Sequence, residues 1–201
     1  MSSARRPGAG PTAGEAAVGI GSGTDYDLDA AIRKIPDHPL PGVLFYDLLP
    51  LFQDPRGLTT CVDRLAGWAR ERQPERVLGV EARGFILGGA LAQALGVGFA
   101  AVRKGGRLPW QTISRDYTLE YGSNSLEIHR DAVAPRQKVL IHDDLLATGG
   151  TALAACRLVE ALGGVVAGIC TVVELTFLPG RETLRGYEVV SLVTYDSEAT
   201  T

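Results

Sequence analysis

The stretch VLIHDDLLATGGT at residues 139–151 limits the folds open to this chain more than any other segment. It begins with a short apolar run typical of a buried parallel strand, and an amphipathic helical pattern follows over residues 152–162. Between the two lie a pair of acids, Asp143 and Asp144, and a loop of small residues. This order predicts an α/β fold with a ligand site where the strand ends.

The chemistry of the loop favours a phosphate. A helix N-terminus presents backbone N–H groups to an anion, and glycines let the backbone turn sharply and approach a ligand closely. The two carboxylates could accept hydrogen bonds from a vicinal diol or hold water on a divalent metal, so a ribose 5-phosphate would fit. A solvated acid pair or a helix cap remains the alternative, and no Walker motif is present. The candidate loop residues are Ala147, Thr148, Gly149, Gly150 and Thr151.

Composition narrows the class of protein. With 201 residues, 45% of them hydrophobic, the chain is long enough for one domain with a real core. A net charge of −3 gives no electrostatic reason to expect nucleic acid or an anionic membrane as a partner. The apolar runs are shorter than the ~20 residues that a membrane helix needs. Three unpaired cysteines and three isolated histidines indicate a reduced, cytoplasmic protein without a zinc site.

The chain divides into a tail and a domain. Residues 1–24 are rich in Gly, Ala, Ser and Pro and are expected to be a disordered tail. Residues 25–201 form the domain, and residues 25–54 lead into it. Within that segment the spacing predicts a short amphipathic helix over residues 26–35, followed by an irregular stretch over residues 37–52.

Strands and helices then alternate, which predicts a parallel sheet of about five strands flanked by helices. Residues 103–125 interrupt this alternation with a basic turn and a long polar stretch, in which residues 117–121 and residues 126–128 could pair as a hairpin. A long excursion of this kind is a candidate for a flexible lid loop. The expected strands are residues 76–80, 97–102, 138–141, 165–173 and 187–193, and the expected helices are residues 55–72, 84–95 and 149–162.

Several motifs together resemble the adenine phosphoribosyltransferase family of type I phosphoribosyltransferases. In chain order they are PGVLFYD, EARGF, RKGGRLP, LEYG with SLEIH, and DDLLATGGT, with a weaker VVELTFLPGRE at residues 172–182. The match as a whole runs from about residue 32 to residue 195, and five separate motifs in the right order make chance agreement improbable. Without the resemblance, Arg83 could equally be a surface ion-pair partner, and the basic turn an ordinary solvated loop.

The resemblance implies where phosphoribosyl pyrophosphate binds. Asp143 and Asp144 would hold the ribose hydroxyls and residues 147–151 the 5-phosphate. Backbone amides near Ala82 would contact the pyrophosphate, and the peptide between Glu81 and Ala82 is expected to be cis. The cations implied at the pyrophosphate are Arg83, Arg103, Lys104 and Arg107.

The resemblance also implies a base site. The segment at residues 25–54 is similar to the family's hood, in which Leu44 or Phe45 would pack on the purine, although Phe45 could equally be core. Glu120 would exchange a proton with the base while Tyr121 closes the site. Two residues depart from the family pattern: Tyr46 stands where an Arg is usual, and His142 where an apolar residue is common.

The activity implied is transfer of the phosphoribosyl group to adenine, giving AMP and pyrophosphate. Mg²⁺ is the expected cofactor, held mainly by phosphoribosyl pyrophosphate and water near the acid pair, with no direct side-chain ligand predicted. The expected partners are these small molecules and a second copy of the chain. Two alternatives remain: transfer to another purine or a pyrimidine, and a regulator that only senses the phosphoribosyl ligand.

Overall fold

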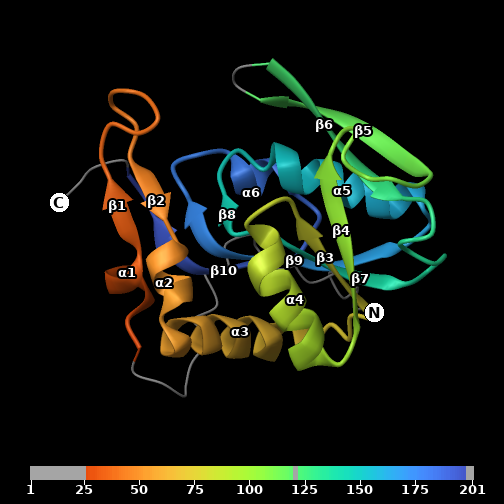
Figure 1. Cartoon of the computed structure of the whole chain (residues 1–201), viewed down its shortest axis with the longest axis horizontal. Coiled ribbons are helices and arrows are strands. Elements are labelled where there is room, and N and C mark those ends of the chain that lie inside the picture. The colour runs from red at the N-terminus through yellow and green to blue at the C-terminus, as the bar shows by residue number, and fades with distance from the viewer. Residues whose placement is uncertain (1–25, 120–121, 198–201) are drawn as a thin grey trace, which may run out of the picture.

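A mixed sheet with a parallel centre forms the middle of the molecule (Figure 1). The computed structural model describes residues 26–119 and 122–197. The central strands are β3 (Arg76–Val80), β4 (Gly98–Lys104), β7 (Lys138–His142), β9 (Val165–Leu175) and β10 (Val189–Tyr195). They lie in the order β10, β9, β7, β3, β4, each parallel to its neighbour. The prediction of about five parallel strands is therefore confirmed.

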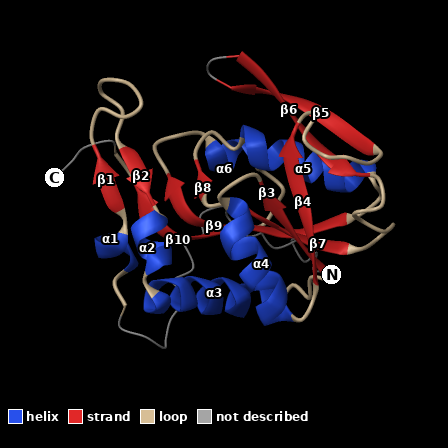
Figure 2. Ribbon diagram, viewed as in Figure 1, coloured by secondary structure: helices blue, strands red, loops and turns tan. Residues whose placement is uncertain are grey.

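Helices cover both faces of this sheet (Figure 2). The helices α3 (Pro55–Arg70) and α4 (Gly84–Leu95) pack together on one face, and α5 (Gly150–Ala161) lies on the other. Successive strand residues point to opposite faces. Accordingly Val77 belongs to the apolar core beneath α3 and α4, whereas Leu78 belongs to the core beneath α5. The near-continuous apolar strands that the sequence shows follow from burial on both faces.

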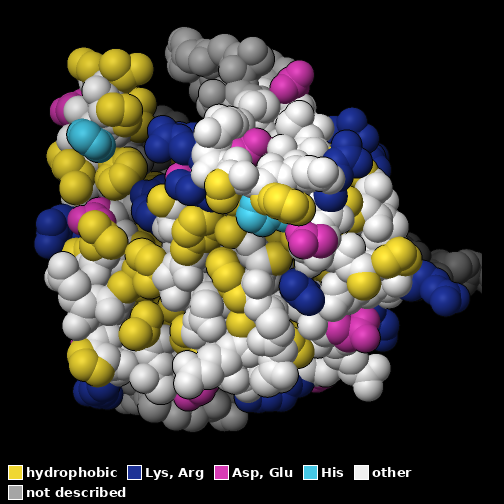
Figure 3. Space-filling view, turned by 45° about the vertical axis from the view of Figure 1, so that its right-hand side comes forward, with side chains coloured by type: hydrophobic (Ala, Val, Ile, Leu, Met, Phe, Trp, Pro, Cys, Tyr) yellow, Lys and Arg dark blue, Asp and Glu magenta, His cyan; other side chains and the backbone are white. Residues whose placement is uncertain are grey.

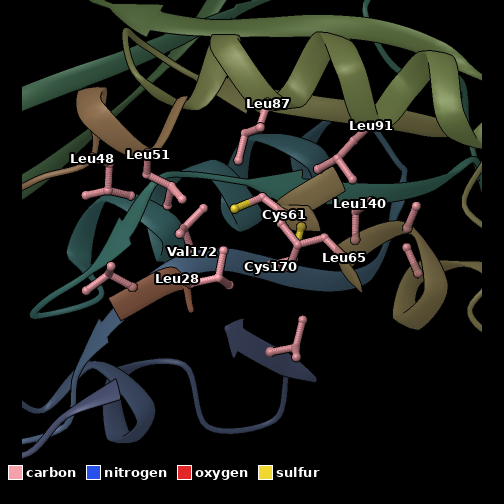
Figure 4. Close-up of a cluster of buried hydrophobic side chains, with 14 of the residues drawn as sticks. Leu28, Leu48, Leu51, Cys61, Leu65, Leu87, Leu91, Leu140, Cys170 and Val172 are labelled. Carbon is pink, nitrogen blue, oxygen red and sulfur yellow. The ribbon is translucent and has the colours of Figure 1, made fainter. Parts of the chain in front are cut away.

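The helix α3 begins where the sequence predicts. The carboxylate of Asp54 accepts a hydrogen bond from the Arg56 amide at 2.9 Å, and Pro55 occupies the first helical position. The helix then turns Leu65 toward the core that Leu87 and Leu91 of α4 also enter, as Figure 4 shows. This packing fixes α4, and with it the turn between β3 and α4.

The prediction of a helix over residues 26–35 is wrong for the second half of that segment. Only α1 (Leu28–Ala31) is helical, and the following β1 (Arg33–Ile35) pairs antiparallel with β2 (Phe45–Asp47). Pairing with β2 overrides the local helical spacing, and Pro36 disfavours a helical conformation at Ile35. The stretch predicted as irregular also contains a helix, α2 (Leu49–Gln53). In Figure 1 these elements form the red and orange group at the left.

Residues 103–125 are largely strand rather than loop, and the hairpin expected near residues 117–128 is present with longer arms. The strands β5 (Thr112–Leu119) and β6 (Gly122–His129) pair antiparallel as a hairpin. The hairpin joins the sheet because β4 pairs with β6 at Arg103 and Lys104. Figure 1 shows the strands β5 and β6 at the upper edge of the molecule. Within residues 26–119 and 122–197, no helix has the length and apolar character needed to cross a membrane.

Candidate active site

The turns that follow β3 and β7 lie side by side. Because these strands are parallel neighbours, their carboxyl ends open on the same edge of the sheet. A side chain at Gly84 would place its Cβ 2.8 Å from the His142 carbonyl oxygen and 3.2 Å from the Asp143 Cα, so only glycine fits there. The peptide between Glu81 and Ala82 is cis, as expected. The EARGF turn and the acid pair therefore form one site.

The two carboxylates are close to each other and largely shielded. Asp144 is 4% exposed, and its backbone N–H donates to Oδ1 of Asp143 at 2.9 Å. The Asp144 carbonyl accepts hydrogen bonds from Val172 and Val173, both at 3.1 Å, which fixes the backbone against β9. Burial raises the pKa of both carboxyl groups, and the neighbouring charge of Asp144 raises that of Asp143 further. Hydrogen-bond donors or a cation in front of such a pair would stabilise its charged form.

Arg83 provides one cation. Its Nε lies 2.7 Å from Oδ2 of Asp144, and this ion pair opposes the rise in the Asp144 pKa that burial causes. The Arg83 side chain is 41% exposed, so it can exchange this partner for a ligand. The ion-pair alternative for Arg83 is thus realised, but inside the candidate site.

The small-residue loop ends in a helix N-terminus. Gly149 precedes α5 with φ of 83°, a left-handed conformation that favours glycine. A Cβ there would also lie 2.9 Å from the Gly180 carbonyl oxygen. The hydroxyl of Thr183 donates to the Thr148 carbonyl at 2.7 Å, which holds the loop from behind. The loop therefore leads into the N-terminus of a 12-residue helix, an arrangement that suits an anion.

Arg103 and Lys104 reach the same edge by way of Glu81. The Arg103 guanidinium lies 2.8 Å from Oε1 of Glu81, and the Lys104 amide donates to Oε2 at 2.9 Å. The hydrogen bond from Arg103 is the largest cause that lowers the pKa of Glu81, and the Lys104 amide adds to it. Partial burial of Glu81 acts in the opposite direction but is outweighed. Arg103 also donates to the Arg107 carbonyl at 3.0 Å. Arg103 thus ties the basic turn to the EARGF turn, while the Lys104 side chain is exposed.

Sequence reasoning missed Glu127. This carboxylate is 6% exposed and accepts hydrogen bonds from the amides of Arg107 and Leu108 at 2.6 and 2.7 Å. It therefore fixes the shape of the basic turn from the neighbouring strand β6. No spacing marks such a residue, because its partners are backbone groups some twenty positions away.

The hood segment, residues 26–54 of the structure, presents Phe45 to the site. The Arg83 guanidinium carbon lies 5.6 Å from the centre of the Phe45 ring. The next residue points the opposite way: Tyr46 is 3% exposed and stacks on Tyr195 with ring centres 4.1 Å apart. Leu44 packs against the core beneath α3 and α4. Of these three residues, Phe45 is therefore the one whose side chain lies beside Arg83 and could contact a planar ligand.

His142 turns away from the carboxylates. Its Nδ1 lies 2.9 Å from the Cys170 carbonyl on β9, and the ring is fully buried. Burial lowers the pKa of His142 to about 4, so the imidazole is neutral near pH 7. The residue that departs from the family pattern thus belongs to the interior of the sheet.

Basic side chains gather at the hollow beside the hood segment in Figure 3. Among residues 26–119 and 122–197, no three His, Cys, Asp or Glu side chains form a cluster able to bind a metal. Glu120 and Tyr121 lie outside the described residues. The structure otherwise brings the predicted positions Ala82, Arg83, Asp143, Asp144 and the loop to one edge of the sheet.

Comparison with known proteins agrees with this geometry. The family model described as "Phosphoribosyl transferase domain" matches residues 54–191. Proteins named adenine phosphoribosyltransferase are similar over most of the chain. One from Solibacter usitatus is 52% identical over 170 residues, which is 85% of this chain and 98% of that protein. One from Desulfitobacterium hafniense is 51% identical over 169 residues, which is 84% of this chain and 98% of that protein.

Solved structures show the same relationship. The crystal structure of adenine phosphoribosyltransferase from Thermoanaerobacter pseudethanolicus superposes with a TM-score of 0.82 at 48% identity, covering 84% of this chain and 98% of that one. The enzyme from Saccharomyces cerevisiae, complexed with adenine and an imino-altritol bisphosphate, gives a TM-score of 0.79 at 40% identity. The match with the Saccharomyces cerevisiae enzyme covers 82% of this chain and 96% of that enzyme's chain.

Proposed function

The chain belongs to the adenine phosphoribosyltransferase family, and from this membership we propose how its residues divide the work of the reaction. The reaction transfers the phosphoribosyl group of phosphoribosyl pyrophosphate to adenine, which releases AMP and pyrophosphate. A bond forms between the base nitrogen and the anomeric carbon while the bond from that carbon to pyrophosphate breaks. The observation that supports the assignment is the contact between the EARGF turn and the acid pair, which would bring the leaving group next to the ribose.

Asp143 and Asp144 accept hydrogen bonds from the ribose hydroxyls in this proposal. Backbone amides and hydroxyls of residues 147–151 hold the 5-phosphate at the N-terminus of α5. Both groups rest on rigid backbone, since the Asp144 carbonyl is fixed by β9 and the loop is held by Thr183. The sugar is thereby oriented before the base attacks, and no covalent nucleophile from the protein is needed.

The leaving group is stabilised by the EARGF turn and the basic turn. Arg83, Lys104 and the Ala82 amide meet the charge that develops on pyrophosphate. Arg107 contributes from the same turn. Arg103 reaches the pyrophosphate less directly, because Glu81 holds its guanidinium at 2.8 Å.

Mg²⁺ suits this donor set. It keeps several waters and is usually bound by one or two carboxylates together with substrate phosphates, rather than by a cage of protein ligands. The described residues offer two adjacent carboxylates and no cluster of three, which fits that mode. Bound there, Mg²⁺ would neutralise the phosphate charge as a Lewis acid.

The base lies between the hood segment and the hairpin tip. The Phe45 ring, beside Arg83, offers one apolar face to adenine, and Leu44 supports the segment from the core. Glu120 exchanges the proton of the base, and Tyr121 covers it when the hairpin closes and excludes water. The active protein lies in the cytoplasm in this proposal, in keeping with three buried free cysteines.

We also propose a homodimer. Ile86 on α4 and Phe99 on β4 are 43% and 37% exposed, although both are large apolar residues. A groove of about 430 Å³ lies between α3 and α4 on the same helix layer, lined in part by Leu58, Val62 and Ala90. A second copy of the chain would cover such a surface. Light scattering of the purified protein should give twice the mass of one chain.

A panel of bases tests the assignment of the base. Adenine, hypoxanthine, guanine, uracil and orotate would each be supplied with phosphoribosyl pyrophosphate and Mg²⁺. We expect adenine to exceed every other base in kcat/KM by at least about 100-fold, because a site built to hydrogen-bond one edge rejects others strongly. A higher kcat/KM for another base would show that adenine is not the preferred substrate. Binding of phosphoribosyl pyrophosphate without turnover of any base would indicate a regulator instead.

A further inference from the structure

A one-turn helix supports the 5-phosphate loop from behind. This helix is α6 (Gly180–Thr183), which follows β9. The Thr183 hydroxyl donates to the Thr148 carbonyl at 2.7 Å, and a Cβ on Gly180 would lie 2.4 Å from the Ala147 carbonyl oxygen. Two successive carbonyls of the loop therefore face α6.

This contact fixes the direction of the loop amides. In a planar trans peptide the N–H points opposite to the C=O of the same unit. Since the carbonyls of Ala147 and Thr148 face α6, the N–H groups of Thr148 and Gly149 point away from it. That direction is the one a phosphate in front of the loop requires.

A helix of four residues is not stable on its own, and α6 needs an anchor. The anchor is Arg181, whose Nε and Nη2 each donate to the Glu174 carboxylate at 2.7 Å. Its Nη1 also donates to the Val189 carbonyl on β10 at 2.7 Å. The planar fork of arginine makes such a two-point contact directional, so the pair fixes the orientation of α6.

Glu174 is a buried residue of the sheet. It lies on β9 and is 2% exposed. Burial alone would raise its pKa, but hydrogen bonds from Arg181 and Ser191 outweigh that effect and the net direction is downward. The group is thus a carboxylate near pH 7, and its charge is matched by Arg181.

We propose that Glu174, Arg181 and Thr183 are positioning residues that hold the 5-phosphate loop in its binding conformation. The sequence of contacts runs from the sheet through Glu174 to Arg181, through α6 to Thr183, and from Thr183 to the Thr148 carbonyl. This inference rests on the proposed role of residues 147–151. None of the three side chains needs to touch the substrate.

Thr183→Val is the main test, because it keeps the shape of the side chain and removes only the hydroxyl. We expect its KM for phosphoribosyl pyrophosphate to rise about 5-fold, the effect of one hydrogen bond, with the KM for adenine unchanged. Arg181→Lys keeps the charge but loses the fork, and should raise the same KM. A merely structural role would lower thermal stability without this selective change.

Glu182→Gln is the matched control on the same helix. Its partner Arg185 lies 3.5 Å away, and both side chains are at least 75% exposed. The control should leave both KM values unchanged. An unchanged KM for phosphoribosyl pyrophosphate in Thr183→Val, or an equal rise in Glu182→Gln, would overturn the inference.

Thr151→Val separates this inference from the function on which it rests. If Thr151→Val raises the KM for phosphoribosyl pyrophosphate and Thr183→Val does not, the loop binds phosphate but α6 does not position it. If neither variant changes that KM, the loop is not the 5-phosphate site, and both proposals fall. A rise in both variants supports both.

Discussion

The Arg83 Nε lies 2.7 Å from the Asp144 carboxylate, so a cation of the EARGF turn directly contacts the acid pair after β7. The two groups are proposed to serve opposite ends of the breaking bond, pyrophosphate and ribose. In this proposal the hydroxyls of bound phosphoribosyl pyrophosphate would replace the guanidinium on Asp144, and Arg83 would turn to the phosphates. The exposed fraction of Arg83, 41%, leaves room for that exchange.

Replacement of Arg83 by Ala should weaken product inhibition by pyrophosphate. Loss of a hydrogen bond between charged groups corresponds to about a 10-fold rise in the inhibition constant, or more. Inhibition kinetics with pyrophosphate as the varied ligand would measure it. Arg157→Ala, which removes an exposed surface arginine, is the control. An inhibition constant equal to that of the unaltered protein would place Arg83 outside the pyrophosphate site.

Substitutions at Phe45 and Tyr46 should have different effects, one on base binding and the other on stability. Phe45→Ala removes the ring beside Arg83 and is expected to raise the KM for adenine about 10-fold without changing that for phosphoribosyl pyrophosphate. Tyr46→Leu disrupts the stack on Tyr195 and should lower the melting temperature while the KM for adenine stays the same. Steady-state kinetics and thermal unfolding on both variants give the comparison. The reverse pattern would mean that the base contacts Tyr46.

Glu120→Ala should affect catalysis more than binding. If Glu120 exchanges the proton of the base, its loss removes general acid–base assistance, which is typically worth about 100-fold or more in kcat. Binding of phosphoribosyl pyrophosphate, measured by calorimetry, should change little. The neighbouring acid Asp116→Ala serves as a control within the same hairpin. An unaltered kcat would remove Glu120 from the mechanism.

Glu127 should make stability depend on pH. Burial works to raise its pKa, but hydrogen bonds from the amides of Leu108 and Arg107 outweigh it and lower the pKa from 4.5. A carboxylate with a lowered folded pKa stabilises the protein fully above its unfolded pKa and loses that contribution as pH falls through the folded value. The difference in unfolding free energy between the unaltered protein and Glu127→Gln should therefore be large at pH 7 and shrink below about pH 4.

Denaturant unfolding at several pH values measures this difference. The exposed Glu71, whose side chain is 82% accessible, provides the control Glu71→Gln. A difference for Glu127→Gln that is constant from pH 7 to pH 3 would show that its charge does not hold the basic turn.

Local patterns were enough to predict the centre of the fold. Residues 76–80 and 84–95 were placed without error, because an apolar strand, a glycine turn and an apolar helix follow one another without competition from distant segments. The start of α3 was equally clear from Asp54 and Pro55. The edge of the sheet that carries the site also followed from sequence, since parallel strands must open on one side.

What could not be predicted depends on pairing at a distance. Residues 33–35 became a strand only because Phe45–Asp47 lies beside them. The roles of Glu127 and Glu174 arise from partners on other elements, which no local spacing reveals. For the same reason the sequence left Leu44 and Phe45 as equal candidates, whereas the structure separates them by the face on which each side chain lies.

The double variant Asp143→Asn with Asp144→Asn tests the central claim most directly, that this acid pair holds the ribose. Because burial raises the pKa of both carboxyl groups, neutral amides should not destabilise the fold. Turnover of adenine and phosphoribosyl pyrophosphate should fall by about 1000-fold or more, with circular dichroism and melting temperature preserved. Turnover close to that of the unaltered protein, in a variant that is folded, would contradict the account.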